Sequence, residues 1–143
     1  MGENKKIKNA ETSTYNNIKF RSKLEERVYR YLTDRLNVSI DYEKHTYDII
    51  PAFIPTVFFY SPFVKSVDKV RKITYTPDLT FEYKGFFVIV ECKGFPNDSY
   101  PLKRKLFRYR LEQEENRDKI LFFEVKSVRD CDNLINILNE KTK

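Results

Sequence analysis

The 143-residue chain contains no tryptophan, only one histidine and only two cysteines. Two cysteines are too few for a disulfide framework, and Cys92 and Cys131 do not have the spacing of a zinc site. We therefore expect reduced thiols, as in a cytosolic protein, with Cys92 buried on the strand face opposite Glu91. The single histidine, His45, has no evident catalytic partner in the sequence, so we interpret it as an ordinary surface or core residue.

Long hydrophobic segments are also missing. No stretch approaches the roughly 18 consecutive apolar residues of a membrane span. Residues 1–6 are polar and lack the apolar region of a secretory signal. Hydrophobic residues make up 41% of the chain and charged residues 34%. These values predict one soluble domain with a real core, located in the cytoplasm and without a membrane partner.

Basic residues are in excess, with 27 Lys and Arg against 21 Asp and Glu, which gives a net charge of +6. A basic protein of this kind favours a polyanionic partner such as DNA. Residues 1–18 are polar and basic and show no periodicity, so we expect a flexible basic arm. That arm is either merely disordered or in contact with DNA. Residues 19–143 are expected to form a single domain.

The most informative stretch is a predicted β-hairpin. Residues 73–83 and 86–93 are rich in β-branched and aromatic side chains, which are typical of strands. Lys84-Gly85 lies between them, and glycine supplies the positive φ that a two-residue hairpin turn needs. With that turn Tyr83 pairs with Phe86, and the same register sets Asp78 opposite Glu91.

Two facing carboxylates favour a cation between them, because like charges on paired residues are destabilising. Mg²⁺ takes oxygen ligands and is often held by one or two carboxylates together with substrate phosphate. Lys93 lies two residues beyond Glu91, so it points to the same face. An ammonium group there can orient a water molecule or stabilise developing negative charge. The alternative is an ordinary hairpin with surface charges.

A helix is predicted over residues 22–36, with Ser22 as its N-cap and Asn37 at its end. Glu25 flanks the apolar stripe and has two interpretations. It completes a capping box with Ser22, or it reaches inward as a third metal ligand, and helix geometry alone slightly favours the cap.

Residues 40–50 are predicted to be a strand, and residues 51–72 a further strand-turn element or a long connection. The apolar run at residues 57–60 is either a strand in the chain's own core or a contact between two chains. A second helix is predicted over residues 100–116, capped by Ser99, with Leu102, Leu106, Tyr109 and Gln113 on one face. Its basic residues form either a solvated face or a phosphate-binding one.

A further strand at 119–125 and a last helix, opened by Asp130 or Asp132 and ending near 141, complete the pattern. We expect Leu134, Ile135, Ile137 and Leu138 to supply that helix's core contacts. The element order predicts an α/β fold with a mixed sheet flanked by helices.

Asp78, Glu91 and Lys93 resemble the signature of the PD-(D/E)xK nuclease superfamily. Phe20-Arg21-Ser22-Lys23-Leu24-Glu25, Tyr75-Thr76-Pro77-Asp78 and Glu91-Cys92-Lys93-Gly94 resemble, in the same order, the endonuclease I family of phage Holliday-junction resolvases. Residues 101–107 also resemble a group of small phage and prophage proteins related to that family. The similarity covers residues 18–125, and the blocks together are far more specific than the central motif.

The resemblance implies a restriction-endonuclease-like fold and Mg²⁺-dependent hydrolysis of DNA, with Mn²⁺ as a substitute. It favours the site role for Glu25, and it implies that Lys93 orients the attacking water. The implied metal ligands are Glu25, Asp78, Glu91 and the Cys92 carbonyl. The implied DNA-backbone contacts are Arg21, Lys103, Arg104, Lys105 and Arg108.

The expected protein is thus a phage- or prophage-encoded, homodimeric endonuclease that acts on branched DNA in the bacterial cytoplasm. Residues 51–72 are longer than in the phage resolvases and the C-terminal region is shorter, which leaves junction specificity and the dimer arrangement open. One alternative is a sequence-dependent or nicking endonuclease of a defence or transposition system. The other is a non-catalytic DNA-binding or assembly protein with a retained fold.

Overall fold

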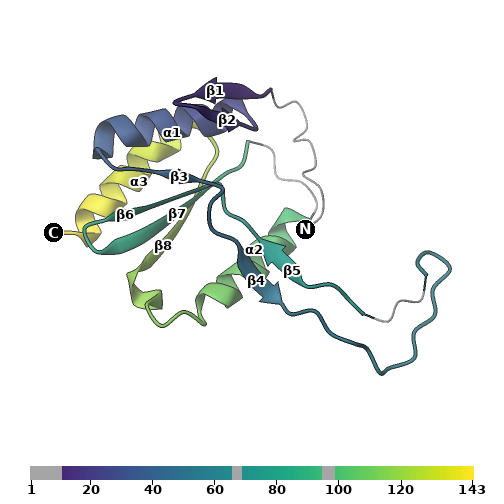
Figure 1. The fold of residues 1–143 in the computed structure, drawn as a ribbon. Helices are drawn as coiled ribbons and strands as arrows, with labels where there is room; N and C mark the ends of the chain where they lie inside the picture. The colour runs from purple at the N-terminus through teal and green to yellow at the C-terminus, as the bar shows by residue number, and fades with distance from the viewer. Residues whose placement is uncertain (1–10, 66–68, 95–98) are drawn as a thin grey trace.

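The computed structural model describes residues 11–65, 69–94 and 99–143. The chain has an α/β fold (Figure 1). Its elements follow in the order β1 (Ser13–Tyr15), β2 (Ile18–Phe20), α1 (Lys23–Leu36), β3 (Asp41–Tyr42), β4 (Tyr47–Ile50), β5 (Ile73–Tyr75), β6 (Leu79–Tyr83), β7 (Phe86–Cys92), α2 (Tyr100–Leu111), a 3₁₀ turn (Arg117–Lys119), β8 (Ile120–Val125) and α3 (Val128–Lys141). No helix within the described residues is long and apolar enough to cross a membrane.

The central sheet has the strand order β3-β6-β7-β8. β7 pairs antiparallel with β6 and parallel with β8, so the sheet is mixed, as the sequence predicts. Val88, Ile89 and Val90 are buried in succession, because both faces of β7 are covered. Helices α1 and α3 cover one face, and α2 with the small β4–β5 sheet lies on the other (Figure 1).

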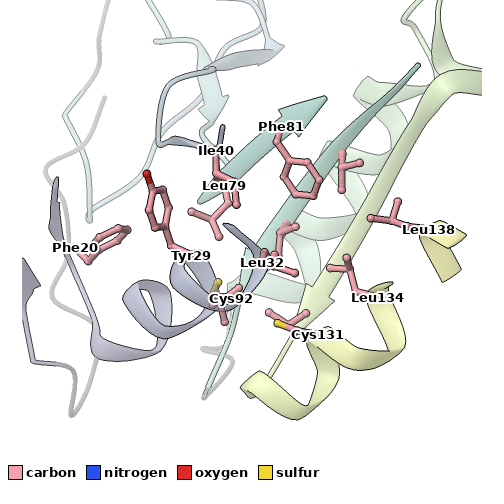
Figure 2. Packing of buried hydrophobic residues seen from close by; sticks show 14 residues of the cluster. Phe20, Tyr29, Leu32, Ile40, Leu79, Phe81, Cys92, Cys131, Leu134 and Leu138 are labelled. Atoms are coloured by element: carbon pink, nitrogen blue, oxygen red, sulfur yellow. The ribbon is translucent and has the colours of Figure 1, made fainter. Parts of the chain in front are cut away.

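The larger core lies between the sheet and helices α1 and α3. Figure 2 shows side chains from these elements meeting in one cluster. Cys92 belongs to this cluster, which confirms that its side chain points away from the face that carries Glu91. Cys131 of α3 is buried beside it, and both thiols are free.

The smaller core lies under α2. Its centre is Phe107, whose ring contacts Tyr47, Tyr75 and Phe122 at centroid distances of 5.0, 4.6 and 5.2 Å. The buried residues of α2 are Tyr100, Phe107 and Leu111. The predicted face was therefore wrong, since Leu102 and Tyr109 are 63% and 68% exposed. The helix also ends at Leu111, five residues before the predicted end.

Helix boundaries follow their caps. Ser22 Oγ accepts the backbone N–H of Glu25 at 3.1 Å, and Asn37 ends α1 in the left-handed conformation. In α3, Ser127 is the N-cap and Asp130 is its capping-box partner. The prediction that Asp130 or Asp132 opens α3 was therefore wrong by one turn. Ile137 is also more exposed than predicted, whereas Leu134 and Leu138 are buried.

Two predicted strands are each divided in two. Residues 40–50 contain β3, which pairs with β6, and β4, which pairs with β5. Glu43, at φ +48°, turns the chain between them, and its N–H donates to the Asp78 carbonyl at 2.8 Å. Residues 73–83 divide likewise into β5 and β6 at Pro77-Asp78, because proline cannot donate a ladder hydrogen bond.

The N-terminal segment is more ordered than the predicted flexible arm. β1 and β2 form a hairpin whose turn residues, Asn16 and Asn17, have φ of 56° and 64°. Tyr15 and Ile18 pack against the larger core. The arm prediction was therefore wrong from residue 13 onward, and residues 1–10 lie outside the described part of the chain.

A long extension leaves the body between β4 and β5 (Figure 1). It is closed near its base by one antiparallel bridge, Phe53–Val70, with hydrogen bonds of 3.0 and 2.7 Å. We call its described part, residues 50–65 and 69–73, the apolar arm. Residues 57–60 are highly exposed in it, so the prediction that they form a strand in the chain's own core was wrong.

A candidate active site at the end of the central hairpin

The β6–β7 hairpin has the predicted register. Tyr83 pairs with Phe86 and Leu79 with Val90, and the turn residues Lys84 and Gly85 both have positive φ. Asp78 lies one residue before Leu79, so the predicted pair of Asp78 with Glu91 falls just beyond the last paired residues of the ladder. The Asp78 carboxylate accepts the backbone N–H of Cys92 at 2.8 Å, so the hairpin holds this side chain against the end of β7.

Glu25, Asp78 and Glu91 are the acidic residues that are buried within the described part of the chain, at 1%, 5% and 4% exposure. We call them the carboxylate cluster. Burial, followed by Glu91 and then Glu25, raises the pKa of Asp78 well above its usual value. Burial also raises the pKa of Glu25 and of Glu91. The three carboxyls therefore lie close enough to disfavour each other's charge, and the cluster favours a proton or a cation.

Glu25 reaches the cluster from α1. Its Oε1 accepts the Tyr42 hydroxyl at 2.7 Å and the Arg21 backbone N–H at 3.2 Å. Ser22 caps the helix, while the Glu25 carboxylate binds the N–H one residue before the cap. The predicted capping box is thus modified, because Glu25 binds the Arg21 N–H and not that of Ser22. The Glu25 side chain also points toward the carboxylate cluster.

Lys93 lies against the cluster, on the face that it shares with Glu91. Its Nζ is 3.5 Å from Glu91 Oε2 and 4.6 Å from the centre of the Tyr100 ring. The side chain is 27% exposed, so solvent reaches it. Glu91 Oε1 accepts the Tyr75 hydroxyl. The ammonium group is thus fixed beside a carboxylate at the edge of a buried site.

Three tyrosines support this site, and sequence reasoning did not identify them as functional. Tyr42 binds Glu25, Tyr75 binds Glu91, and Tyr100 underlies Lys93 while its hydroxyl donates to Glu124. Each hydroxyl has its pKa raised, mainly by burial and further by the neighbouring carboxylate. Tyr75 lies directly before the Thr76-Pro77-Asp78 segment, but nothing in its spacing indicated that it would contact Glu91.

The predicted DNA-binding residues divide into two groups. Lys103, Lys105 and Arg108 are exposed on α2. Arg104 instead binds Glu124 at 2.6 Å, and Arg21 forms an ion pair with Glu43 at 3.3 Å. An open pocket of about 410 Å³ adjoins α2, lined by Arg104, Arg108, Leu111, Glu112, Arg117, Ile120, Phe122 and Glu124. Arg117 is a basic residue of this surface that the sequence pattern did not indicate.

His45 lies apart from these groups. Its ring stacks edge-on with Phe87 at 5.5 Å, and its Nε2 is 3.9 Å from an Asp41 carboxylate oxygen. Its side chain is 41% exposed. This position agrees with the interpretation of His45 as a surface residue.

Across residues 11–65, 69–94 and 99–143, no group of three or more His, Cys, Asp or Glu side chains forms a ready metal-binding cluster. The smaller donor set that Mg²⁺ uses beside substrate phosphate is nevertheless present. Asp78 needs only Oδ2 for its bond to Cys92, and Glu91 lies next to the Cys92 carbonyl in the chain. The buried Thr80 hydroxyl, on the same strand face, has no hydrogen-bond partner in the described structure. By their chemistry, these oxygens are ligands of the type that a hard cation takes.

Residues 5–129 match the family described as "Protein of unknown function (DUF1064)". No curated protein and no solved structure matches the chain. The family match spans the β1–β2 hairpin, the carboxylate cluster, the apolar arm and α2. The chain therefore belongs to the DUF1064 family.

Proposed function

We propose that this protein is a metal-dependent endodeoxyribonuclease of the PD-(D/E)xK type that selects branched DNA. One observation carries the proposal: three buried carboxyls of raised pKa share a site with a lysine at the end of a β-hairpin. Buried charge without a counter-ion is costly. Strongly perturbed ionisable groups beside a specific charged partner are typical of catalytic sites.

Asp78 and Glu91, with the Cys92 carbonyl, would hold Mg²⁺, and Glu25 would complete the site or hold a second ion. The bound ion supplies charge stabilisation at the scissile phosphate and at the leaving 3′ oxygen. Lys93 orients the attacking water, since its Nζ is already 3.5 Å from Glu91. Tyr75 and Tyr42 keep Glu91 and Glu25 in position through their hydroxyl groups. The products are a 5′ phosphate and a 3′ hydroxyl.

The exposed basic residues of α2 would hold the DNA backbone. Lys103, Lys105 and Arg108 have the exposure needed to contact phosphates. Arg104 contributes less to binding, because its guanidinium already binds Glu124 and through it supports Tyr100 under Lys93. We therefore assign Arg104 mainly to positioning. Arg21 has a similar position, since Glu43 partly neutralises it.

Branched DNA is proposed as the substrate, with the protein acting as a homodimer. A junction needs two symmetric cuts, and each chain has one carboxylate cluster, so a twofold pair of chains is the simplest arrangement. The setting would be the cytoplasm of a bacterium that carries the phage or prophage. A sequence-dependent or nicking endonuclease would use the same residues and would differ in its preferred DNA.

A second candidate is a non-catalytic DNA-binding protein that retains the nuclease fold. The observation that favours it is the lack of a ready three-ligand metal cluster in the described residues. The two functions differ in metal dependence. A binding protein holds DNA equally well with and without Mg²⁺ and leaves it intact, whereas the nuclease cleaves it only with the metal.

The test is a cleavage assay with labelled four-way junction, flap and linear duplex of matched sequence, in Mg²⁺, in Mn²⁺ and with EDTA. We expect metal-dependent cleavage that is fastest on branched DNA. Lys93→Ala should lose most of the rate while its fold and DNA binding persist. Lys93→Arg should restore little, because a planar guanidinium does not replace a compact ammonium. Intact DNA under every metal condition, or wild-type cleavage by Lys93→Ala, would contradict the proposal.

A further inference from the structure

The apolar arm holds most of the large apolar side chains that the described residues expose. Eleven of the fourteen belong to it: Ile50, Phe53, Ile54, Val57, Phe58, Phe59, Tyr60, Phe63, Val64, Val70 and Ile73. Phe58 and Phe63 are 89% and 90% exposed. Contiguous apolar surface of this kind is rare on monomeric proteins and marks a contact surface. We propose that the arms of two copies of this chain pack against each other and form a twofold dimer.

The composition of the arm favours a protein partner over nucleic acid. Residues 51–64 contain no charged side chain, and the basic residues of the arm are Lys65 and, around the Phe53–Val70 bridge at its base, Lys69, Arg71 and Lys72. Interface cores are depleted in charge and enriched in Phe and Tyr, as this segment is. Surfaces that bind unpaired bases combine their aromatic residues with basic groups that follow the phosphates. The outer part of the arm has the aromatic residues without these charges.

The body of the protein offers no matching surface for the arm of another copy. Outside the arm, the large apolar side chains exposed in the described residues are Leu102 and Tyr109 on α2 and Ile137 on α3. Three single side chains on two helices do not make a continuous patch. The apolar surface on a second copy that can cover the arm is therefore the same arm, which gives a self-complementary interface with twofold symmetry.

The area of the arm is sufficient for a stable dimer. Aromatic side chains bury roughly 150–250 Å² each when covered. Five such residues, at 48–90% exposure, lie in the arm with two exposed aliphatic residues, Ile54 and Val57, between them. Their coverage would bury on the order of 1,000 Å² per chain, against about 800 Å² per partner in a standard interface.

The root of the arm is attached firmly to the candidate active site. Arg110 Nε of α2 donates to the Asp48 carbonyl of β4 at 2.9 Å. Tyr75, at the end of β5, binds Glu91. An arm-to-arm dimer would therefore connect two carboxylate clusters through β4 and β5, whatever reaction they perform, and the dimer can be tested without a nuclease assay.

The experiment measures the mass of the full chain by light scattering and sedimentation over a wide concentration range, without DNA. The wild type should have twice the 17.3 kDa chain mass. The double variant Phe58→Asp/Phe63→Asp should be a monomer with an unchanged circular dichroism spectrum, because these side chains make no core contacts in the single chain. The matched control is Leu102→Asp, an exposed leucine outside the arm, which should remain dimeric.

A second variant is a control for the case in which the charged substitutions unfold the protein. It replaces residues 54–64 by a glycine-serine linker of equal length and should also be a folded monomer. A wild type that is monomeric at every concentration would overturn the proposal. Single-stranded DNA affinity, measured separately on the wild type and the arm variants, would in that case assign the arm to unpaired bases if the variants lost it. A dimer that persists in the linker variant would overturn it as well, since the contact would then lie on the body.

Discussion

The carboxylate cluster and the apolar arm meet at β5. Each region reverses the usual pattern, in which charged side chains are exposed and apolar side chains are buried. Tyr75 of β5 binds Glu91 in the cluster, and Ile73 of the same strand is the last residue of the arm. The cluster buries charged groups, and the arm exposes apolar ones. Charged side chains are rarely buried without partners, and large contiguous apolar patches are rarely left in water. Each region therefore indicates a partner that the single chain does not supply.

The protein compensates the cluster only in part. The Tyr75 hydroxyl and Lys93 lower the pKa of Glu91, and the Cys92 N–H and Lys93 lower that of Asp78, but burial is the larger effect and both pKa values remain raised. The missing stabilisation is electrostatic, and a divalent cation would provide it. The apolar side chains of the arm, in contrast, are left exposed within the described residues, and another arm would cover them.

The largest expected effect is on cleavage by Glu91→Gln and Asp78→Asn. Each change keeps the shape and removes a charge from the cluster, so the rate should fall by at least about 100-fold. DNA binding should persist or strengthen, because the negative charge near the phosphate is removed. Cleavage and binding are measured in parallel with Glu82→Gln, an exposed glutamate of the same hairpin, as the control. Undiminished cleavage by either variant would remove the cluster from the reaction.

A smaller effect is expected when Tyr75→Phe removes only the hydroxyl that binds Glu91. Groups that orient metal-binding carboxylates typically affect metal affinity or activity by about 10–100-fold. We expect a loss in that range, with the Mg²⁺ concentration for half-maximal cleavage shifted upward. Tyr109→Phe, which alters an exposed tyrosine of α2, should leave both unchanged. Equal behaviour of the two variants would mean that Tyr75 serves only the packing around Phe107.

The sequence predicts the hairpin and its register because these depend on local rules. The Lys84-Gly85 turn fixes which residues pair, and pairing then brings Asp78 to the end of β7 beside Glu91. Ser22 and Asn37 bound α1 for equally local reasons. These elements carry the α/β architecture and the central part of the site.

The other features depend on contacts between segments distant in sequence. Tyr42 and Tyr75 reach the cluster only because Glu43 and Pro77 break two strand-like segments, a change that composition did not indicate. The buried face of α2 depends on the aromatic residues of β4, β5 and β8 that surround Phe107. Arg104 looked like a DNA contact because Glu124, its partner, lies twenty residues later.

The smallest binding effect is expected from neutralising Lys103, Lys105 and Arg108 together. DNA affinity should weaken, and the slope of log affinity against log salt should fall by roughly 0.9 for each duplex phosphate that these side chains no longer neutralise. The change should be similar for unrelated sequences, since phosphate contacts do not read bases. Arg104→Ala is the comparison and should change the slope less, because Glu124 already binds this arginine. A triple variant with the wild-type slope would place the DNA elsewhere.

The central proposal is that the carboxylate cluster is an electrostatically unbalanced site that binds a divalent cation. Burial, Glu91 and Glu25 raise the pKa of Asp78 above its ordinary value of 3.8. At pH values between the unfolded-state and folded-state pKa, the folded chain therefore keeps a proton that the unfolded chain has released. The resulting stability is fully present below that ordinary value and is lost as pH rises through the folded-state pKa. The Asp78→Asn variant does not lose this stability, because an asparagine side chain does not ionise.

The most direct measurement is therefore thermal unfolding of the wild type and Asp78→Asn from acid to neutral pH, with and without Mg²⁺. We predict that the variant gains stability relative to the wild type as pH rises. Millimolar Mg²⁺ should raise the unfolding temperature of the wild type at neutral pH and affect the variant less, because a ligand of the folded state stabilises it. Parallel pH profiles and no Mg²⁺ effect on either protein would contradict the account.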